Sequence, residues 1–401
     1  MFKRMLPLIL SVIFLSAAIV YVADTDKSRE ETDQSETQTF EILEPTEEMR
    51  GVWVTYMTLD IENESDKEAA FEEKIHTIIS DMKSADLNTM IVQVRPFCDA
   101  IYPSRYFPWS HILTGTQGQN PGFDPLQTII NSAHKNSIKV HAWINPYRIS
   151  TKNTPSQLSS DHPYKKDDNI GVEVNGSIYL NPASEKAIKL IADGAKELAE
   201  KYDIDGVQFD DYFYPPDCGD FDAADYEAYC SKTDQPLTLE NFRKENVSRM
   251  VEQVYHSIHE TGKNIVFGIS PQGNLNNNEG LYADVITWCK EKGYIDYICP
   301  QIYFSLDNPA LTFEDGLKDW LKIEKHENLA LYIGIPAYKA GTDADSGTWL
   351  DNDDILTTEI GIAREMKTDG FILYSYDSFH NEDNEAEVQN VIRYLTSSPT
   401  Q

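Results

Sequence analysis

Hydrophobic and polar positions from residue 49 onward follow two alternating periods. Short apolar runs rich in Val, Ile and aromatic residues alternate with longer stretches whose apolar residues recur at helical spacing. The apolar runs predict strands at 51–59, 89–96, 138–147, 206–214, 265–271, 295–304, 330–337 and 370–377. The stretches between them predict helices at 67–85, 125–136, 183–201, 239–261, 281–292, 313–326, 355–367 and 385–395.

This alternation favours an α/β protein with a (β/α)8 barrel of the TIM type, spanning 49–401. A doubly wound sheet is less compatible, because the chain has no Gly-x-Gly-x-x-Gly fingerprint. Two long irregular stretches, 149–177 and 215–238, follow the third and fourth strands. They are expected on the face where such barrels carry their active sites.

Polar residues recur at alternate positions near the C-terminal ends of the predicted strands. Successive side chains of a strand point to opposite faces, so residues of one parity are expected to line the barrel mouth together. The residues with this parity are Gln93, Arg95, His141, Trp143, Asn145, Gln208, Asp210, Ser270 and Gln301. A barrel that served only as a scaffold would not need them, and the pattern therefore predicts a functional site.

The sharpest motif is Asp-Gly-Val-Gln-Phe-Asp-Asp-Tyr-Phe-Tyr-Pro at 205–215, where an apolar strand ends in Asp210 and Asp211. Glycosidases need a proton donor and a negative charge beside an oxocarbenium-like transition state, and paired carboxylates supply both. The aromatic rings that follow suit the C–H faces of sugars. The alternative is that the two aspartates only cap the next loop, as Asp often does.

Other residues are candidates for substrate binding. Arg95 is expected to hold Asp99 or a substrate carboxylate, with an interior salt bridge as the alternative. His141 and Asn145 are candidates for binding sugar hydroxyls, although an interior histidine fits the pattern of His141 equally well. Gln301 belongs to the same polar set, and Asp377 is a candidate distant carboxylate. The candidate stacking rings are Trp53, Trp109, Trp143, Tyr147, Tyr214, Tyr303, Tyr374 and Tyr376.

The chain resembles the glycosyl-hydrolase-like family 10. The matching stretches are 49–54, 94–96, 99–104, 108–110, 124–126, 140–148, 210–211 and 268–271. The resemblance covers nearly everything from residue 49 to about residue 395. It implies a bacterial cell-envelope barrel glycosidase, related to enzymes that cut peptidoglycan strands without stem peptides and to the hydrolase half of a poly-N-acetylglucosamine-modifying protein. One departure is Cys98, where family members commonly carry Gly.

The Asp210-Asp211 pair is also similar to that of β-N-acetylglucosaminidases with substrate-assisted catalysis. That similarity implies that Asp210 orients the 2-acetamido group and that Asp211 protonates the leaving oxygen. Both can reach one sugar only where the strand unravels. The competing mechanism pairs one of them with Asp99 or Asp377, with retention or inversion set by the distance between the carboxyl groups. A catalytically silent carbohydrate-binding barrel is the alternative from a different class.

The N-terminal segment and the charge indicate the compartment and the partners. Lys3 and Arg4 precede an apolar run over 6–22, so 1–23 is expected to be a signal peptide or an N-terminal membrane anchor, and 24–48 an acidic disordered linker. The expected location is therefore extracellular or the cell envelope. A formal net charge of −32 argues against nucleic acid and anionic membrane surfaces, except through such an anchor. The expected partner is a polysaccharide.

The sequence predicts no cofactor and no metal site. It lacks a Cys-x-x-Cys pair, a His-Glu-x-x-His motif and a phosphate-binding glycine loop. The segment 343–347 hints at a calcium loop but lacks the required ligand spacing. Of the five cysteines, Cys218 and Cys230 share one loop region and are expected either to pair or to remain buried thiols.

Overall fold

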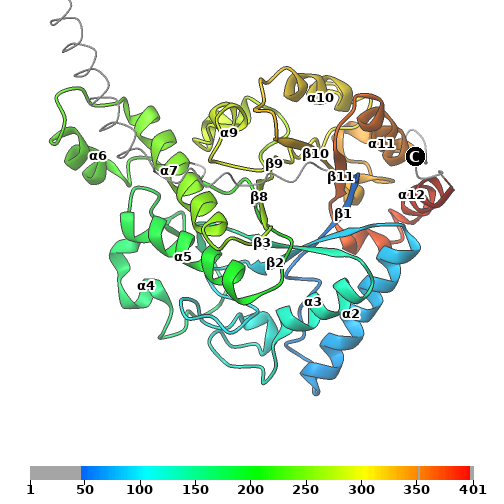
Figure 1. Cartoon of the computed structure of the whole chain (residues 1–401), viewed down its shortest axis with the longest axis horizontal. Coiled ribbons are helices and arrows are strands. Elements are labelled where there is room, and N and C mark those ends of the chain that lie inside the picture. The colour runs from blue at the N-terminus through cyan, green and yellow to red at the C-terminus, as the bar shows by residue number, and fades with distance from the viewer. Residues whose placement is uncertain (1–46, 216, 351–352, 398–401) are drawn as a thin grey trace, which may run out of the picture. The chain divides into compact units, whose positions relative to one another are not determined.

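A computed structural model describes residues 47–215, 217–350 and 353–397. Within these ranges, parallel strands close a barrel in the order β1-β11-β10-β9-β8-β7-β3-β2 (Figure 1). The strands are β1 (Met49–Val54), β2 (Thr89–Arg95), β3 (Lys139–Ile144), β7 (Gly206–Phe209), β8 (Val266–Ile269), β9 (Tyr297–Ile298), β10 (Ala330–Ile335) and β11 (Gly370–Leu373). The (β/α)8 prediction is confirmed.

Helices follow the strands and surround the barrel (Figure 1). They are α2 (Lys67–Ser84), α3 (Pro125–Lys135), α5 (Glu185–Lys201), α7 (Leu239–His259), α9 (Val285–Lys290), α10 (Phe313–Leu321), α11 (Ile355–Glu365) and α12 (Glu385–Ser397). Most begin at a residue whose side chain accepts a hydrogen bond from a first-turn N–H, which satisfies a donor that the helix itself leaves unpaired. These N-caps are Asp66, Asp124, Ser184, Thr238, Asp284 and Thr312.

Several strands are shorter than their apolar runs predict. β7 ends at Phe209 and β9 at Ile298, although the runs continue to 214 and 304. Beyond Ile298 the backbone keeps only isolated bridges, such as those from Gln301 to Gln272 and Gly334. The residues beyond these strand ends are the polar and aromatic ones at the mouth. They therefore contribute side chains to the site and no backbone pairing to the sheet.

The barrel interior is filled by its own cluster of side chains, distinct from the larger core between strands and helices. Its buried members are Met49, Trp53, Ile91, Trp143, Tyr297, Cys299, Ala330, Tyr332 and Ile372. Glycines on neighbouring strands make room for the large rings. A Cβ at Gly206 would meet the His141 ring, and one at Gly268 would meet the Tyr297 ring. The interior is therefore a packed core, as in other barrels of this type.

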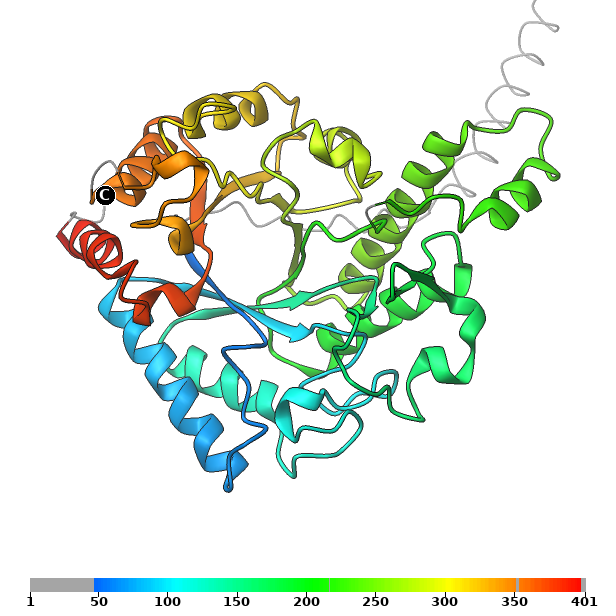
Figure 2. The same cartoon turned by 180° about the vertical axis from the view of Figure 1, so that it is seen from behind.

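The two long loops contain structure that the sequence did not predict. After β3, the strands β4 (Arg148–Ser150), β5 (Gly171–Val174) and β6 (Ser177–Leu180) form an antiparallel sheet in the order β4-β6-β5. After β7, α6 (Ala223–Cys230) lies near the outer end of α7 (Figure 2). The other helices of the described residues are short: α4 (Pro163–Lys166), α8 (Asn277–Gly280), η1 (His111–Leu113), η2 (Asp168–Ile170), η3 (Ala337–Lys339), η4 (Asp345–Gly347) and η5 (Tyr376–His380).

The expected signal or anchor at 1–23 lies outside the described residues, as does nearly all of the expected linker. Glu48, at the end of that linker, forms an ion pair of 2.6 Å with Arg364 of α11 and thus belongs to the folded barrel. None of the helices within the described ranges is long and apolar enough to cross a membrane. All five cysteines are described and are free thiols. Cys218 and Cys230 neither pair nor lie fully buried, as both are partly exposed.

Candidate active site

Asp210 and Asp211 follow directly on the last paired residue of β7. The ladders of β7 with β3 and with β8 both end at Phe209, so neither aspartate is held in alternating strand geometry. Both carboxyl groups consequently bind residues at the C-terminal ends of neighbouring strands. The strand thus ends before the pair and not at residue 214 as predicted, and the condition that the substrate-assisted mechanism sets on the backbone is met.

Asp210 is held by donors at the C-terminal end of β3 and from its own loop. The Trp143 indole N–H donates to Asp210 Oδ2 over 3.1 Å, and the side-chain amide of Asn145 donates to the same oxygen. The backbone N–H of Tyr212 donates to Oδ1 over 3.2 Å. Only 5% of the residue is exposed. These contacts fix the carboxyl group at the mouth of the barrel.

A second set of contacts fixes the orientation of Asn145. Its Oδ1 accepts from Gln93 Nε2 over 2.6 Å and from Arg148 Nη2 over 2.9 Å. Gln93 is oriented in turn, because its Oε1 accepts from the backbone N–H of Tyr56 over 2.9 Å. With its oxygen occupied by two donors, Asn145 can only present its amide nitrogen to Asp210.

Asp211 is held by different residues, on the other side of β7. Gln272, after β8, donates to Oδ2, and Gln301, after β9, donates to Oδ1 over 3.2 Å. Asp211 is 7% exposed and lines a cavity of about 260 Å³ together with Tyr179, Tyr212 and Tyr214. The two carboxyl groups are thus adjacent in sequence but have separate sets of donors.

Burial shapes the ionisation of the pair. Loss of hydration and the neighbouring charge of Asp211 raise the pKa of Asp210 to about 7, although Arg148 acts in the opposite direction. Burial also raises the pKa of Asp211, and the amides of Gln272 and Gln301 oppose that rise. Two such groups titrate as a unit. The pair can therefore hold one proton near neutral pH, as an acid catalyst requires.

Aromatic rings line the mouth on the side of β9, β10 and β11. The ring centroid of Tyr374 lies 5.9 Å from that of Trp53, 6.5 Å from Trp143 and 5.8 Å from Tyr303. Tyr338 joins this group at 5.8 Å from Tyr374. Tyr303, Tyr338 and Tyr374 thus form one aromatic group, and Tyr374 connects it to the interior rings Trp53 and Trp143.

The expectation that Arg95 opens on the mouth is wrong. The register between β2 and β3 shifts between Gln93 and Arg95, so the two residues do not share a face. Gln93 points inward to Asn145, whereas Arg95 stacks on Phe107 at 4.3 Å beside Gly194 of α5. Its Nη1 is buried with no hydrogen-bond partner among the described residues. Arg95 thus packs between the barrel and its helices.

The two distant carboxylates do not join the pair. Asp99 is fully buried and accepts hydrogen bonds from the Phe97 N–H and from Gln117, both over 3.2 Å. Asp377 is exposed and accepts from Thr58 Oγ1 over 2.8 Å. In the described part of the chain, neither forms a hydrogen bond or ion pair with Asp210, Asp211 or the residues that bind them. Asp99 instead shapes the loop after β2.

Cys98 in that loop adopts a φ of 52°, in the left-handed region that glycine favours. The glycine that the family resemblance implies at this position would adopt such a conformation without steric cost.

Other predicted residues are buried. His141 is hydrogen-bonded to the Tyr297 hydroxyl at 3.0 Å, and burial lowers its pKa to about 4, so it is a neutral interior residue. Tyr147 is fully buried, and its hydroxyl has no partner within the described ranges. The Tyr214 ring is buried but borders the cavity beside Asp211. Tyr376 also lies in the core, and Trp109 is partly buried and packs against this core.

Sequence reasoning missed several residues of the site: Gln93 as a positioning group, Arg148, Tyr212, Gln272 and Tyr338. Arg148 is the last residue of the family-like stretch 140–148, and Gln272 directly follows the stretch 268–271. The motifs were therefore recognised in the sequence, but the roles of these two residues were not. Tyr338 carried no signal beyond its place after a predicted strand.

Comparison with known proteins agrees with this geometry. A family model described as Glycosyl hydrolase-like 10 matches residues 48–351. Glycosyl hydrolase YngK of Bacillus subtilis (strain 168) is 36% identical over 344 residues, covering 80% of this chain and 66% of that protein. Glycosyl hydrolase DigH of Escherichia coli (strain K12) is 28% identical over 386 residues, covering 87% of each chain.

Solved structures share the fold. The glycoside hydrolase domain of PgaB (BpsB) from Bordetella bronchiseptica matches with a TM-score of 0.50 and 13% identity, covering 86% of this chain and 98% of that one. A β-galactosidase from Rahnella sp. R3 matches with a TM-score of 0.59 and 11% identity, covering 89% and 58%. With the family match over most of its barrel, the chain belongs to the glycosyl hydrolase-like 10 family and is a glycoside hydrolase.

Proposed function

We propose that the protein cleaves an N-acetylhexosamine-containing polysaccharide, a peptidoglycan glycan strand or a related exopolysaccharide, outside the cytoplasm. The observation that carries the proposal is the buried Asp210-Asp211 pair, whose members have separate donors and share one mouth. Adjacent carboxyl groups of this kind suit a substrate whose own acetamide takes part in the reaction.

In the proposed mechanism, the 2-acetamido oxygen attacks the anomeric carbon while Asp211 donates its proton to the departing glycosidic oxygen. Asp210 accepts the acetamide N–H and aligns the group. That hydrogen bond favours the ionised form of Asp210, so the proton that the pair shares in the free enzyme shifts to Asp211 when substrate binds. Water then opens the cyclic intermediate, with Asp211 acting as the base. The cavity beside Asp211 leaves space for the leaving sugar.

The competing pairings have less support. Asp99 is enclosed in its loop and Asp377 binds threonine hydroxyls at the rim. A silent carbohydrate-binding barrel would gain nothing from two buried carboxyl groups with raised pKa values, which cost stability at neutral pH. Both features favour the enzyme with the adjacent pair.

The test is to incubate peptide-free peptidoglycan glycans and poly-N-acetylglucosamine with the wild-type protein and with Asp211→Asn. We expect shorter products from at least one polymer with the wild type and a loss of cleavage in the variant. Asp377→Asn, which changes an exposed carboxylate, is the matched control and should keep its activity. Intact polymers after incubation with the wild type would refute the proposed function.

Export belongs to the same proposal. A charged start followed by an apolar run over 6–22 supports either a cleaved signal or a retained anchor. Fractionation of cells that produce the full chain should recover it outside the cytoplasm, and N-terminal sequencing of that material distinguishes the two forms. Recovery only from the cytoplasm would contradict this part.

A further inference from the structure

Two tyrosine rings at the mouth are unusually exposed for large aromatic side chains. Tyr212 is 52% exposed and Tyr338 is 43% exposed. Tyr212 follows the carboxylate pair after β7, and Tyr338 lies in η3 after β10. In the barrel order, β8 and β9 separate these two strands, and their loops supply Gln272 and Gln301, which hold Asp211.

Other aromatic rings support Tyr338 from below. Its centroid lies 6.1 Å from Tyr303 and 5.8 Å from Tyr374, both at edge-to-face angles. Tyr303 and Tyr374 contact each other at 5.8 Å. Tyr338 is thus an exposed ring that packs on the partly buried rings of Tyr303 and Tyr374, which belong to the aromatic group at the mouth.

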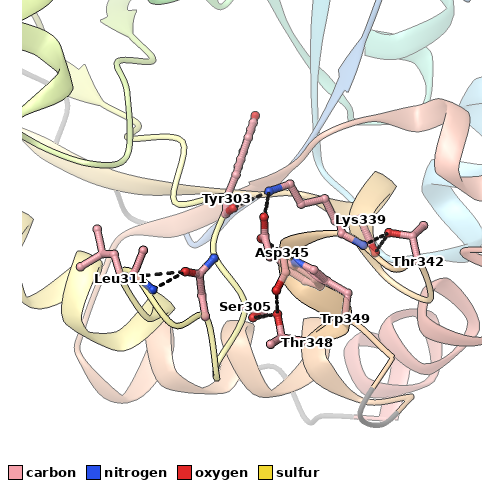
Figure 3. Close-up of polar contacts among 11 residues, drawn as sticks. Tyr303, Ser305, Leu311, Lys339, Thr342, Asp345, Thr348 and Trp349 are labelled. Atoms are coloured by element: carbon pink, nitrogen blue, oxygen red, sulfur yellow. Dashed lines mark hydrogen bonds and ion pairs between the residues drawn. The ribbon is translucent and has the colours of Figure 1, made fainter.

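The loop that carries Tyr338 is held in place by polar contacts. Lys339 Nζ donates to the backbone oxygen of Tyr303 over 2.9 Å and forms an ion pair of 3.0 Å with Asp345. The Trp349 indole donates to Asp345 over 2.8 Å, and Ser305 donates to Thr348 over 2.6 Å (Figure 3). The loops after β9 and β10 are thereby tied together, and the ring is positioned before any ligand binds.

Tyr212 has a comparable setting beside the pair. The Arg148 guanidinium lies 5.8 Å from its ring centroid, and the ring borders the cavity that Asp211 and Tyr179 also line. Tyr179 comes from β6, in the sheet that the loop after β3 adds. The site therefore has one positioned aromatic ring, Tyr212, next to the carboxylate pair, and a second, Tyr338, separated from it by the strands β8 and β9.

We infer that Tyr338 is the platform of a sugar subsite separate from the reacting sugar, and that Tyr212 serves the sugars on the other side of the scissile bond. Apolar C–H faces of pyranose rings stack on such aromatic faces. A chain bound by both rings crosses the mouth with sugars on either side of the pair. The enzyme then cuts internal bonds, and this inference rests on the proposed function.

The binding test uses the Asp211→Asn variant, so that the ligand survives the measurement. Calorimetry gives dissociation constants for N-acetylglucosamine oligomers of two and of six units. Adding Tyr338→Ala should weaken binding of the hexamer roughly 3- to 10-fold, the range expected for one lost stacking contact, and weaken binding of the dimer less. Tyr338→Phe should restore hexamer binding, because the ring face and not the hydroxyl makes the contact.

Leu350→Ala is the matched control, since Leu350 is an exposed apolar residue of the same loop and has no ring. It should leave hexamer binding unchanged. Equal weakening for dimer and hexamer, no effect of Tyr338→Ala, or no binding of either oligomer would overturn the subsite. If the wild type cuts no glycan but hexamer binding still depends on Tyr338, the subsite stands and the proposed function fails.

The mode of cleavage is read separately from early products of the wild type on a long polymer. Internal cleavage predicts a fast fall in mean chain length with little monomer or dimer. Release of only terminal units would overturn the inference of a chain bound on both sides.

Discussion

Asn145 donates its amide to Asp210, the first carboxyl group of the pair, while its own oxygen is held by Gln93 and Arg148. The residue that directly follows β3 thus connects the interior of the barrel to the chemistry at its mouth. Because both acceptor positions of Asn145 are filled, the direction of its donor is fixed before substrate arrives, which is the condition for electrostatic preorganisation.

Replacing Asn145 should therefore impair catalysis more than folding. Asn145→Ala removes a donor to Asp210, and kcat is expected to fall about 10²-fold, the typical cost of losing one preorganised donor. Steady-state kinetics on the cleaved polymer and circular dichroism measure the two effects. Unchanged kcat in a folded variant would show that the orientation of Asp210 does not matter.

Arg148 should set the alkaline limb of the pH profile. Its charge lowers the pKa of Asp210, which still reaches about 7. Arg148→Met removes that charge, so the pair should keep its proton to higher pH and the limb of kcat/KM should move upward. Arg148→Lys, which keeps the charge, is the control and should move it less. A downward shift in Arg148→Met would contradict this electrostatic role.

Glu359 should make stability depend on pH. This carboxyl group of α11 is fully buried, both oxygens lack partners among the described residues, and burial and the charge of Glu387 raise its pKa well above the usual value. The folded state thus binds a proton that the unfolded chain has lost above about pH 4.3, the ordinary glutamate pKa. The stability that this proton contributes is complete below that pH and is lost as the pH rises through the folded pKa.

The glutamine side chain of Glu359→Gln cannot ionise. The melting temperature of this variant should therefore rise relative to that of the wild type as the pH is raised from about 4 to 8. The unfolding free energy of the variant relative to the wild type, measured by calorimetry, should rise by on the order of 1–3 kcal/mol between the two ends of that range. A difference between variant and wild type that stays constant with pH would mean that Glu359 is not the titrating group.

The sequence predicted the parts of the fold that depend on periodic patterns. The strand and helix runs identified the barrel. The alternation of polar residues indicated the mouth, where the structure places Trp143, Asn145, Asp210 and Gln301, although the last three lie beyond the ends of their strands. It failed at Arg95, because a single irregularity in β2 reverses the faces and leaves no mark in the alternation of residues. One shifted register moved a predicted substrate-binding residue into the outer core.

Loop contacts between distant residues could not be predicted from patterns at all. Tyr338 lies at the mouth because Lys339 binds Asp345 and the backbone of Tyr303, and no local signal links these residues. The sheet that carries Tyr179 likewise depends on pairing between β4, β5 and β6 inside a stretch that reads as irregular. Such features follow from tertiary packing and not from local propensity.

The central claim is the division of roles between Asp210 and Asp211, and leaving-group dependence tests it most directly. The measurement compares Asp211→Asn and Asp210→Asn on a natural glycan and on an aryl N-acetylglucosaminide with an acidic phenol. Asp211→Asn should lose roughly 10²–10⁴-fold in kcat/KM on the glycan but far less on the aryl glycoside, which needs little protonation. Asp210→Asn should lose similar factors on both, because alignment of the acetamide is needed whatever group departs. The reverse pattern would exchange the two roles, and two active variants alongside an inactive Asp99→Asn or Asp377→Asn would contradict the account.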